Sequence, residues 1–502
     1  MKRTLTIAVA VALGATASTA DAVMLKSRGT GQVLIYPYYT VNHQQTLVSV
    51  INTTAHGKAL KVRFREGYNG RDVANFNLYL GPYDSWVGAV YDTSSDGAGA
   101  AAIATNDNSC TVPAFPLAPV PGTLHALTFS NANYSQGDYG TPTGTDHGPT
   151  NLARTREGFF EIIEMGEVVD QASGSHETLE AITPVNATPP GCTQIRNAWA
   201  NGGYWTTSAG TDLLPPAGGV YGAAGLVNVA QGTLYAYDAT AIDGFSDVVQ
   251  HTGPGDAKPN LSTAVTDSAH DIAAAYVPIG NAMIKSDYPA TARGVDAVSA
   301  VLMAGLLANE YLTDPAVGAS SEWVITFPTK QFYVDPAIVG AAPLGAVAPF
   351  EETFGGSGIS CSATDPKSYD RAGDPLGPTL PPPEGGPSAD GKRLCYESQL
   401  FTFNQAGVDF GDPTMVLGSL LGFNYNSYSR GWLALSFNDP TEQLRTSLEG
   451  NVFFGLPAVG FLAVNYINAN VTPGVLSNYS GVYPHRSTAS CTNSTNPQSS
   501  CP

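Results

Sequence analysis

Short runs in which apolar and polar residues alternate make up much of the chain after residue 30. In residues 59–65 the apolar side chains occupy every second position, and the basic residues Lys61, Arg63 and Arg65 lie between them. Such alternation is typical of a strand with one face on a core and the other in solvent, so the basic side chains should point outward. Similar runs occur at 32–36, 46–52, 76–80 and 86–91. Their spacing predicts an immunoglobulin-like β-sandwich over residues 23–130 that shares strands with later segments.

The rest of the chain continues this β pattern with one exception. Further strands are expected at 159–169, 226–239, 322–334, 399–403, 432–437 and 460–467. Residues 294–312 differ, because Val295, Val298, Leu302 and Leu306 recur at close to the helical period. We therefore predict a mainly β chain with long loops stapled by disulfides and one short helical segment.

Composition divides the second half of the chain into segments. The Pro- and Gly-rich stretch 341–394 includes Leu-Pro-Pro-Pro-Glu-Gly-Gly at 380–386, which a central strand cannot accommodate, so a linker or stapled loop is expected. It separates a central β-rich region (131–340), which holds the helix, from C-terminal sandwich strands (395–484) and a flexible tail (485–502). A chain of 502 residues exceeds one ordinary core, so two or three domains are expected.

The first 22 residues follow the pattern of a secretory signal peptide. Lys2 and Arg3 precede an apolar run at 5–17, and the Ala-Asp-Ala sequence that ends at Ala22 fits a signal peptidase site. We expect cleavage before Val23. No later run reaches the roughly 20 apolar residues of a membrane helix, so no transmembrane segment is expected after cleavage. The prediction is an exported protein, located in the periplasm, on the outer surface or in the extracellular medium.

Six cysteines lie after the expected cleavage site, and none forms a C-x-x-C pair. In an oxidising compartment an even number of cysteines indicates disulfides. The simplest pairing joins sequence neighbours, although other pairings are open: Cys110–Cys192, Cys361–Cys395 and Cys491–Cys501. A metal site is a weaker reading, because tetrahedral sites use closely spaced Cys and His residues.

The chain is strongly acidic, with 23 Lys and Arg against 42 Asp and Glu and a formal net charge of −19. Loss of the signal peptide would remove two basic residues and one acidic residue, which gives −20 for the mature chain. Nucleic acid and anionic lipid are disfavoured as partners, because both are bound by positively charged surfaces. The partners that remain are other cell-envelope proteins, further copies of this chain, and glycans.

The sequence lacks the motifs of familiar active sites. It contains no G-x-S-x-G, H-E-x-x-H, C-x-x-C-H or P-loop, no complete G-x-G-x-x-G and no EF-hand series. Glu161 and Glu164 lie on one expected strand but would point to opposite faces, so they cannot form a glycosidase pair by themselves. No catalytic or cofactor-binding residue is therefore assigned.

Two groups of residues are candidates for binding. Asp92, Asp96 and Asp107 lie in oxygen-rich turns that could contribute to a Ca²⁺ site, although such a site needs about six to eight oxygens and flexible loops are the alternative. Five aromatic residues could line a flat carbohydrate-binding face, while ordinary sandwich core and rim is the alternative. They are Tyr36, Tyr38, Tyr39, Tyr83 and Trp86.

Four runs of residues, at 31–40, 62–67, 322–330 and 465–470, resemble a family of uncharacterised exported proteins of Gram-negative bacteria. The resemblance implies export and one architecture over most of the mature chain, and it implies no activity. We predict an exported cell-surface or periplasmic structural or binding protein: adhesin-like, surface-layer or filament-like, or glycan-binding. The alternative is a secreted hydrolase that acts on polysaccharide through an acidic site built from loops.

Overall fold

A computed structural model of the chain is mainly β, as the sequence predicts. The structure describes residues 22–26, 29–94, 96–117, 124–141, 144–170, 176–339, 347–354, 358–376, 393–405, 411–468, 472, 474–475, 477–494 and 496–501. The predicted signal peptide therefore lies outside the described residues, except for Ala22. Among the described residues, no helix combines the length and the apolar character needed to cross a membrane.

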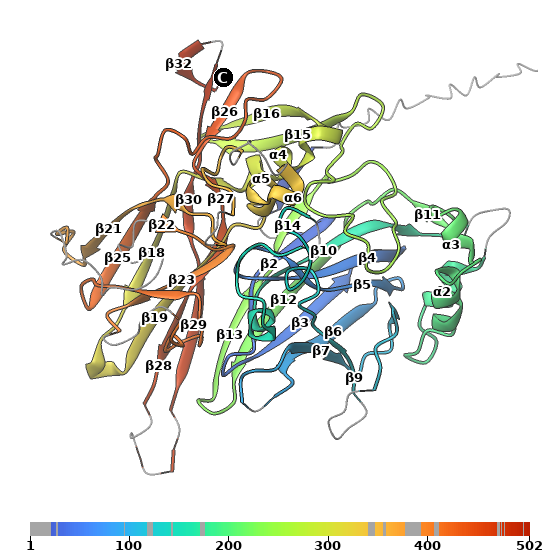
Figure 1. Cartoon of the computed structure of the whole chain (residues 1–502), viewed down its shortest axis with the longest axis horizontal. Helices are drawn as coiled ribbons and strands as arrows, with labels where there is room; N and C mark the ends of the chain where they lie inside the picture. Colours follow the sequence, from blue (N-terminus) through green and yellow to red (C-terminus); the bar gives the residue numbers. More distant parts are fainter. Residues whose placement is uncertain are drawn as a thin grey trace, which may run out of the picture.

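Two antiparallel sheets from the first half of the chain form a β-sandwich, drawn in blue to green in Figure 1. The eight-stranded sheet contains, in spatial order, β1 (Met24–Lys26), β14 (Thr240–Asp243), β2 (Val33–Thr40), β10 (Glu157–Val168), β4 (Gly57–Glu66), β5 (Asp72–Leu80) and β8 (Cys110–Val112), with β11 (Leu213–Leu214) beside β10. The six-stranded sheet contains β13 (Thr233–Asp238), β12 (Val220–Asn228), β3 (Gln45–Asn52), β6 (Ser85–Asp92), β7 (Ala101–Thr105) and β9 (His125–Thr128). The predicted boundary at residue 130 falls inside this sandwich, because β10 lies between β2 and β4.

The eight-stranded sheet is covered on both faces. Leu34 and Tyr36 of β2 join the core shared with the six-stranded sheet, while Val33 and Ile35 join the core on the opposite side. This second layer buries the basic side chains of β4, so the expectation that Lys61, Arg63 and Arg65 face solvent is wrong. The cover comes from a distant loop, in which the carbonyl oxygens of residues 253 and 259 accept hydrogen bonds from the Lys61 and Arg63 side chains.

The predicted helix is present but shorter than expected. A hairpin of β15 (Ile272–Ile279) and β16 (Ala282–Pro289) leads into α4 (Ala290–Leu302), which packs on it. The segment that follows is extended, as β17 (Met303–Ala304) and β18 (Leu306–Leu312), so the prediction of helix to residue 312 is wrong. The extended form is favoured because β18 has a pairing strand on each side, β25 (Arg430–Ser436) and β30 (Arg486–Thr488).

A second β-sandwich, drawn in yellow to red in Figure 1, is built from residues 306–488. Its four-stranded sheet contains β21 (Asp365–Asp370), β25 (Arg430–Ser436), β18 and β30 (Arg486–Thr488). Its five-stranded sheet contains β24 (Gly422–Tyr425), β23 (Ser398–Phe403), β19 (Ala319–Thr326), β28 (Val459–Tyr466) and β29 (Tyr479–Pro484). Part of the predicted linker is therefore a strand, since β21 pairs along its whole length with β25.

The remaining elements are short. The helices are α1 (Thr178–Ile182), α2 (Cys192–Ala198), α3 (Tyr204–Thr207), α5 (Gln331–Val334), α6 (Pro336–Val339) and the 3-10 turns η1 (Leu152–Arg156) and η2 (Pro315–Val317). The strands are β20 (Ser362–Ala363), β22 (Arg393–Leu394), β26 (Asn451–Phe454), β27 (Leu456–Pro457), β31 (Ser490–Asn493) and β32 (Asn496–Ser500). The predicted flexible tail is thus folded into β30, β31 and β32.

The cross-links of the structure tie these parts together. Three disulfides join the cysteine pairs that the sequence predicts: Cys110–Cys192, Cys361–Cys395 and Cys491–Cys501. The two sandwiches share a core, in which Val324, Leu400 and Phe461 of the five-stranded sheet pack with residues of the first sandwich. The side-chain hydroxyl of Ser480 on β29 also bonds to the backbone of Leu234 on β13.

Candidate functional site

The aromatic residues proposed as a carbohydrate-binding face do not form one. Tyr36, Tyr38, Tyr39 and Trp86 are 0% exposed, and only Tyr83 reaches solvent, at 70%. The three β2 tyrosines are buried because their strand lies inside a sheet that is covered on both faces. The core alternative therefore applies to four of the five residues.

The three aspartates proposed for Ca²⁺ are only partly brought together. Asp92 and Asp96 line one pocket of about 550 Å³, and Asp107 is not part of its lining. Both carboxylate oxygens of Asp92 accept hydrogen bonds from Arg156, at 2.6 and 2.7 Å. Burial would raise the pKa of Asp92, but the hydrogen bonds and charge of Arg156 together with hydrogen bonds from Ser94 outweigh it, and the pKa is lowered. Across the described ranges, no group of three or more His, Cys, Asp and Glu residues is placed to hold a metal ion.

The two glutamates of β10 lie on opposite faces, as expected, and both are fully buried. Glu161 lies 3.2 Å from Arg63 and 3.7 Å from Arg65. Glu164 accepts hydrogen bonds from the Lys58 ammonium at 2.7 Å and from a backbone N–H at residue 218. Burial raises the pKa of Glu164 to about 7. These carboxylates hold strands together and do not reach a surface cleft.

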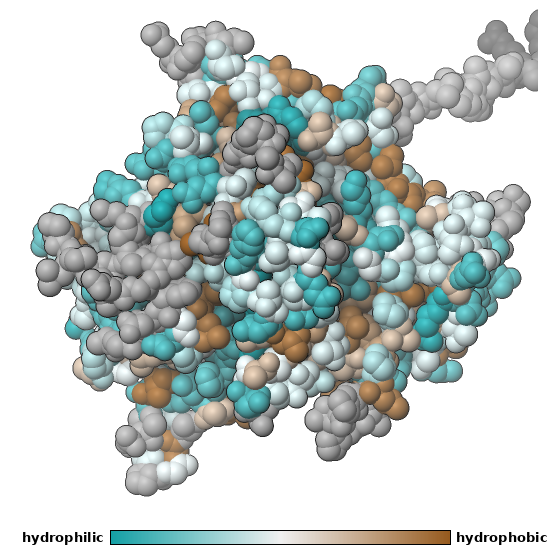
Figure 2. Space-filling model, viewed as in Figure 1, coloured by the Kyte–Doolittle hydropathy of each residue, from teal (hydrophilic) through white to brown (hydrophobic). Residues whose placement is uncertain are grey.

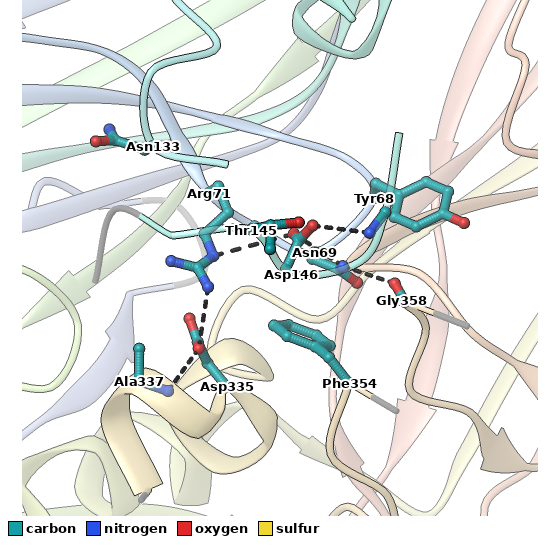
Figure 3. Close-up of polar contacts among 12 residues, drawn as sticks. Tyr68, Asn69, Arg71, Asn133, Thr145, Asp146, Asp335, Ala337, Phe354 and Gly358 are labelled. Atoms are coloured by element: carbon teal, nitrogen blue, oxygen red, sulfur yellow. Dashed lines mark hydrogen bonds and ion pairs between the residues drawn. The ribbon is translucent and has the colours of Figure 1, made fainter. Parts of the chain in front are cut away.

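A second buried ionic cluster joins the two halves of the chain, as Figure 3 shows. Arg71, which precedes β5, lies 3.2 Å from Asp335 and 4.0 Å from Asp146. The Asn69 amide donates to Asp146 at 3.0 Å and to the carbonyl oxygen of Gly358 at 2.7 Å. Asp146 is 0% exposed and Asp335 2% exposed, so the cluster is closed to ligands. Its evident role is to fix the segments around residues 335 and 358 against the first sandwich.

The accessible feature of the first sandwich is the outer face of its six-stranded sheet. Strands usually place polar residues on a solvated face, but here a groove of about 520 Å³ is lined by apolar and small residues. Larger side chains rise beside it: Leu47, Val87, Leu124 and Leu234 are 41–51% exposed. Small residues form its floor, namely Ser49, Gly88, Ala89, Ala104, Ala223, Gly225 and Ala236. We call these eleven residues the uncharged face.

None of the described residues that line this groove carries a charge. Figure 2 shows brown, hydrophobic residues interspersed among polar ones over the lower part of the view, where the six-stranded sheet lies. The sequence hints at this face in the run 45–52, because neither the odd-numbered nor the even-numbered positions of that strand carry a charged residue. An exposed groove lined by apolar and small residues is a candidate interaction site.

Comparison with family models, curated proteins and solved structures gives no match to the chain. Function is therefore inferred from the surfaces of the chain itself.

Proposed function

We propose that the chain is an exported structural or binding protein, periplasmic or at the cell surface, which associates with a second copy of itself through the uncharged face. The signal-peptide pattern and three disulfides support export, because disulfides persist in oxidising compartments. The uncharged face is the observation that carries the proposal, since an apolar sheet surface is stabilised when a partner covers it.

Charge favours a second copy as that partner. At a net charge of −19, two copies repel each other over most of their surfaces. A face without acidic side chains is where this repulsion is weakest, and the lining of the groove has none.

The shape of the face also favours self-association. Two sheets stacked face to face lie about 10 Å apart, and small residues allow that approach. In a two-fold arrangement the same patch meets itself, so Leu47 and Leu234 of one copy can enter the small-residue floor of the other. The face is thus complementary to itself, with raised leucines beside a floor of alanine and glycine.

Hydrolysis of polysaccharide has less support. The carboxylates of Glu161 and Glu164 are fully buried and held by basic groups, so neither can reach a glycosidic bond. Glycosidases place two accessible carboxyl groups on either side of the scissile bond.

The test is the mass of the mature protein in solution, measured by light scattering and sedimentation over a range of concentrations. We expect a reversible dimer, and a monomer for the double variant Leu47→Lys/Leu234→Lys. Both side chains are about half exposed, so the variant should fold. Met283→Lys on β16, where the side chain is 61% exposed, is the matched control and should stay dimeric. A monomeric wild type, or a dimer that survives the double substitution, would overturn the proposal.

A further inference from the structure

The second sandwich carries an aromatic cleft that the proposed function does not use. It lies where the chain leaves the five-stranded sheet at the end of β29 and enters the four-stranded sheet as β30. Its volume is about 480 Å³, within the range of about 300–1,000 Å³ that is usual for small-ligand sites. Its lining includes the charged and aromatic side chains of Glu310, Arg371, Trp432, Tyr483 and Arg486.

The aromatic rings of this cleft are exposed, unlike those of β2. Trp432 is 39% exposed and Tyr483 55% exposed. The Trp432 ring stacks on Tyr369 at a centroid distance of 4.4 Å and an angle of 14°, which holds it parallel to its neighbour. A flat ring supported on one side can pack its free surface against the C–H groups of a sugar, whose hydroxyls remain available for hydrogen bonds.

Two arginines of the cleft form no ion pair with a described carboxylate. Among the described arginines, only Arg196, Arg371 and Arg486 form no ion pair, and two of these three line the cleft. Acidic residues outnumber basic ones by 42 to 23, so most arginines find a carboxylate within the chain. A guanidinium group forms two parallel hydrogen bonds with a carboxylate, so the two arginines favour an anionic ligand.

Backbone contacts fix the rest of the cleft. The carbonyl oxygen of Glu310 accepts a hydrogen bond from the Trp323 indole at 3.0 Å, while the Glu310 side chain is exposed. Across the strands Glu310 pairs with Trp432, which in turn pairs with Tyr369, so the three side chains share one face of the sheet. The Asn309 amide donates to the carbonyl oxygens of residues 483 and 484, at 3.2 Å each, and holds the corner.

We infer that this cleft binds an acidic saccharide, a sugar chain that carries carboxylate groups, such as a polyuronate. Trp432 and Tyr483 stack on the sugar rings, and Glu310 accepts hydrogen bonds from hydroxyl groups. Arg371 follows one edge strand of the four-stranded sheet and Arg486 lies on the other, and each binds a carboxylate of the sugar chain. A nucleotide also combines a flat ring with negative charge, and the titration tests it as the alternative ligand. The inference does not depend on self-association, since the uncharged face belongs to the other sandwich.

The experiment is calorimetric titration of the mature protein with three probes: oligogalacturonate, the neutral cello-oligosaccharide of equal length, and a nucleoside monophosphate. We expect oligogalacturonate to bind at least about tenfold more tightly than the other two, because charge-assisted hydrogen bonds contribute about 1.5–3 kcal/mol. Its affinity should fall with added salt. Equal binding of the neutral sugar, tighter binding of the nucleotide, or no binding by oligogalacturonate would each overturn the inference.

Variants locate the binding. Trp432→Ala and the double variant Arg371→Ala/Arg486→Ala should each weaken oligogalacturonate binding by about tenfold or more. Arg196→Ala is the matched control, since Arg196 also lacks an ion pair but lies on α2, outside the cleft, and it should bind like the wild type. Unchanged affinity in the double arginine variant would show that the acid is bound elsewhere. Circular dichroism checks that each variant is folded, and the ligand comparison on the wild type stands whether or not they are.

Discussion

Replacing Arg154 by Met should destabilise the protein far more than removing a surface arginine. The Arg154 guanidinium, which is buried, donates to both carboxylate oxygens of Glu66, at 2.7 and 2.9 Å. It also donates to Asp146, at 2.9 Å through Nη1 and through a second contact from Nη2. The ring of Tyr134 lies 4.2 Å from the guanidinium carbon. Without the guanidinium, two buried carboxylates would lose their shared cation.

The size of the effect follows from that loss. Breaking a buried ion pair by removing one partner costs about 3–5 kcal/mol, because an uncompensated charge stays buried. Met keeps much of the side-chain stem, so little of the cost comes from a cavity. Arg430→Met is the control, since Arg430 is 52% exposed and pairs with Asp314 at 3.0 Å. Exposed pairs contribute about 0–1 kcal/mol, so the two variants should differ by at least about 2 kcal/mol.

The assay is urea unfolding of the mature protein, followed by circular dichroism and by tryptophan fluorescence, whose transitions must coincide for a two-state free energy. The difference should also depend on pH. Burial would raise the pKa of Asp146, but the hydrogen bonds and charge of Arg154, together with hydrogen bonds from Asn69 and the Gly148 backbone, outweigh it and the native pKa is lowered. A lowered native pKa contributes stability above the unfolded value of about 4, and that contribution is lost as pH falls through the native pKa. Arg154→Met and Arg430→Met variants of equal stability at neutral pH would refute this reasoning.

Two further predictions concern a buried acid and a disulfide. Glu397 is buried, and burial outweighs the opposing charge of Lys330 and raises the pKa of the carboxyl group to about 8. The raised native pKa means that stability is greatest below the unfolded value of about 4.3 and is lost as pH rises toward 8. Glu397→Gln should remove up to about 1.4 kcal/mol per pH unit of that decline. Wild-type and variant stabilities, measured by urea unfolding, that change in parallel between pH 5 and 8 would contradict the raised pKa of Glu397. The disulfide of Cys110 and Cys192 spans 82 residues, so replacing both cysteines by Ser should lower the free energy of unfolding by about 4–5 kcal/mol according to the chain-entropy relation. A urea midpoint equal to that of the oxidised wild type would contradict this expectation.

The strands and disulfides could be predicted from the sequence because their signals are local. Alternation at 59–65 predicts a strand whatever covers it, and pairing neighbouring cysteines reproduces all three bridges. Whether the polar face of a strand meets solvent or a covering segment depends on residues far away in the sequence. The loop that covers Lys61 and Arg63 is nearly 200 positions away, so their burial leaves no trace in the local pattern.

Two predictions were wrong because the sequence pattern fits more than one structure. The apolar positions of residues 294–312 fit a helix, but in the last seven of them Leu307 and Tyr311 also fit a strand, and pairing with β25 decides the outcome. The tyrosines of β2 look like an aromatic surface until the second layer is known. The aromatic cleft had no local motif, because Glu310, Trp432 and Arg486 come from three strands that meet only in the fold.

The distribution of basic residues links the two proposals. Arg63, Arg65, Arg71 and Arg154 all neutralise buried carboxylates inside the protein. Cations used in this way cannot offset the acidic groups at the surface, so the surface of the protein is dominated by negative charge. On such a surface a second copy can approach most easily at a face without charge, and an anionic ligand can approach only where arginines are left unpaired. The uncharged face meets the first condition, and the aromatic cleft meets the second.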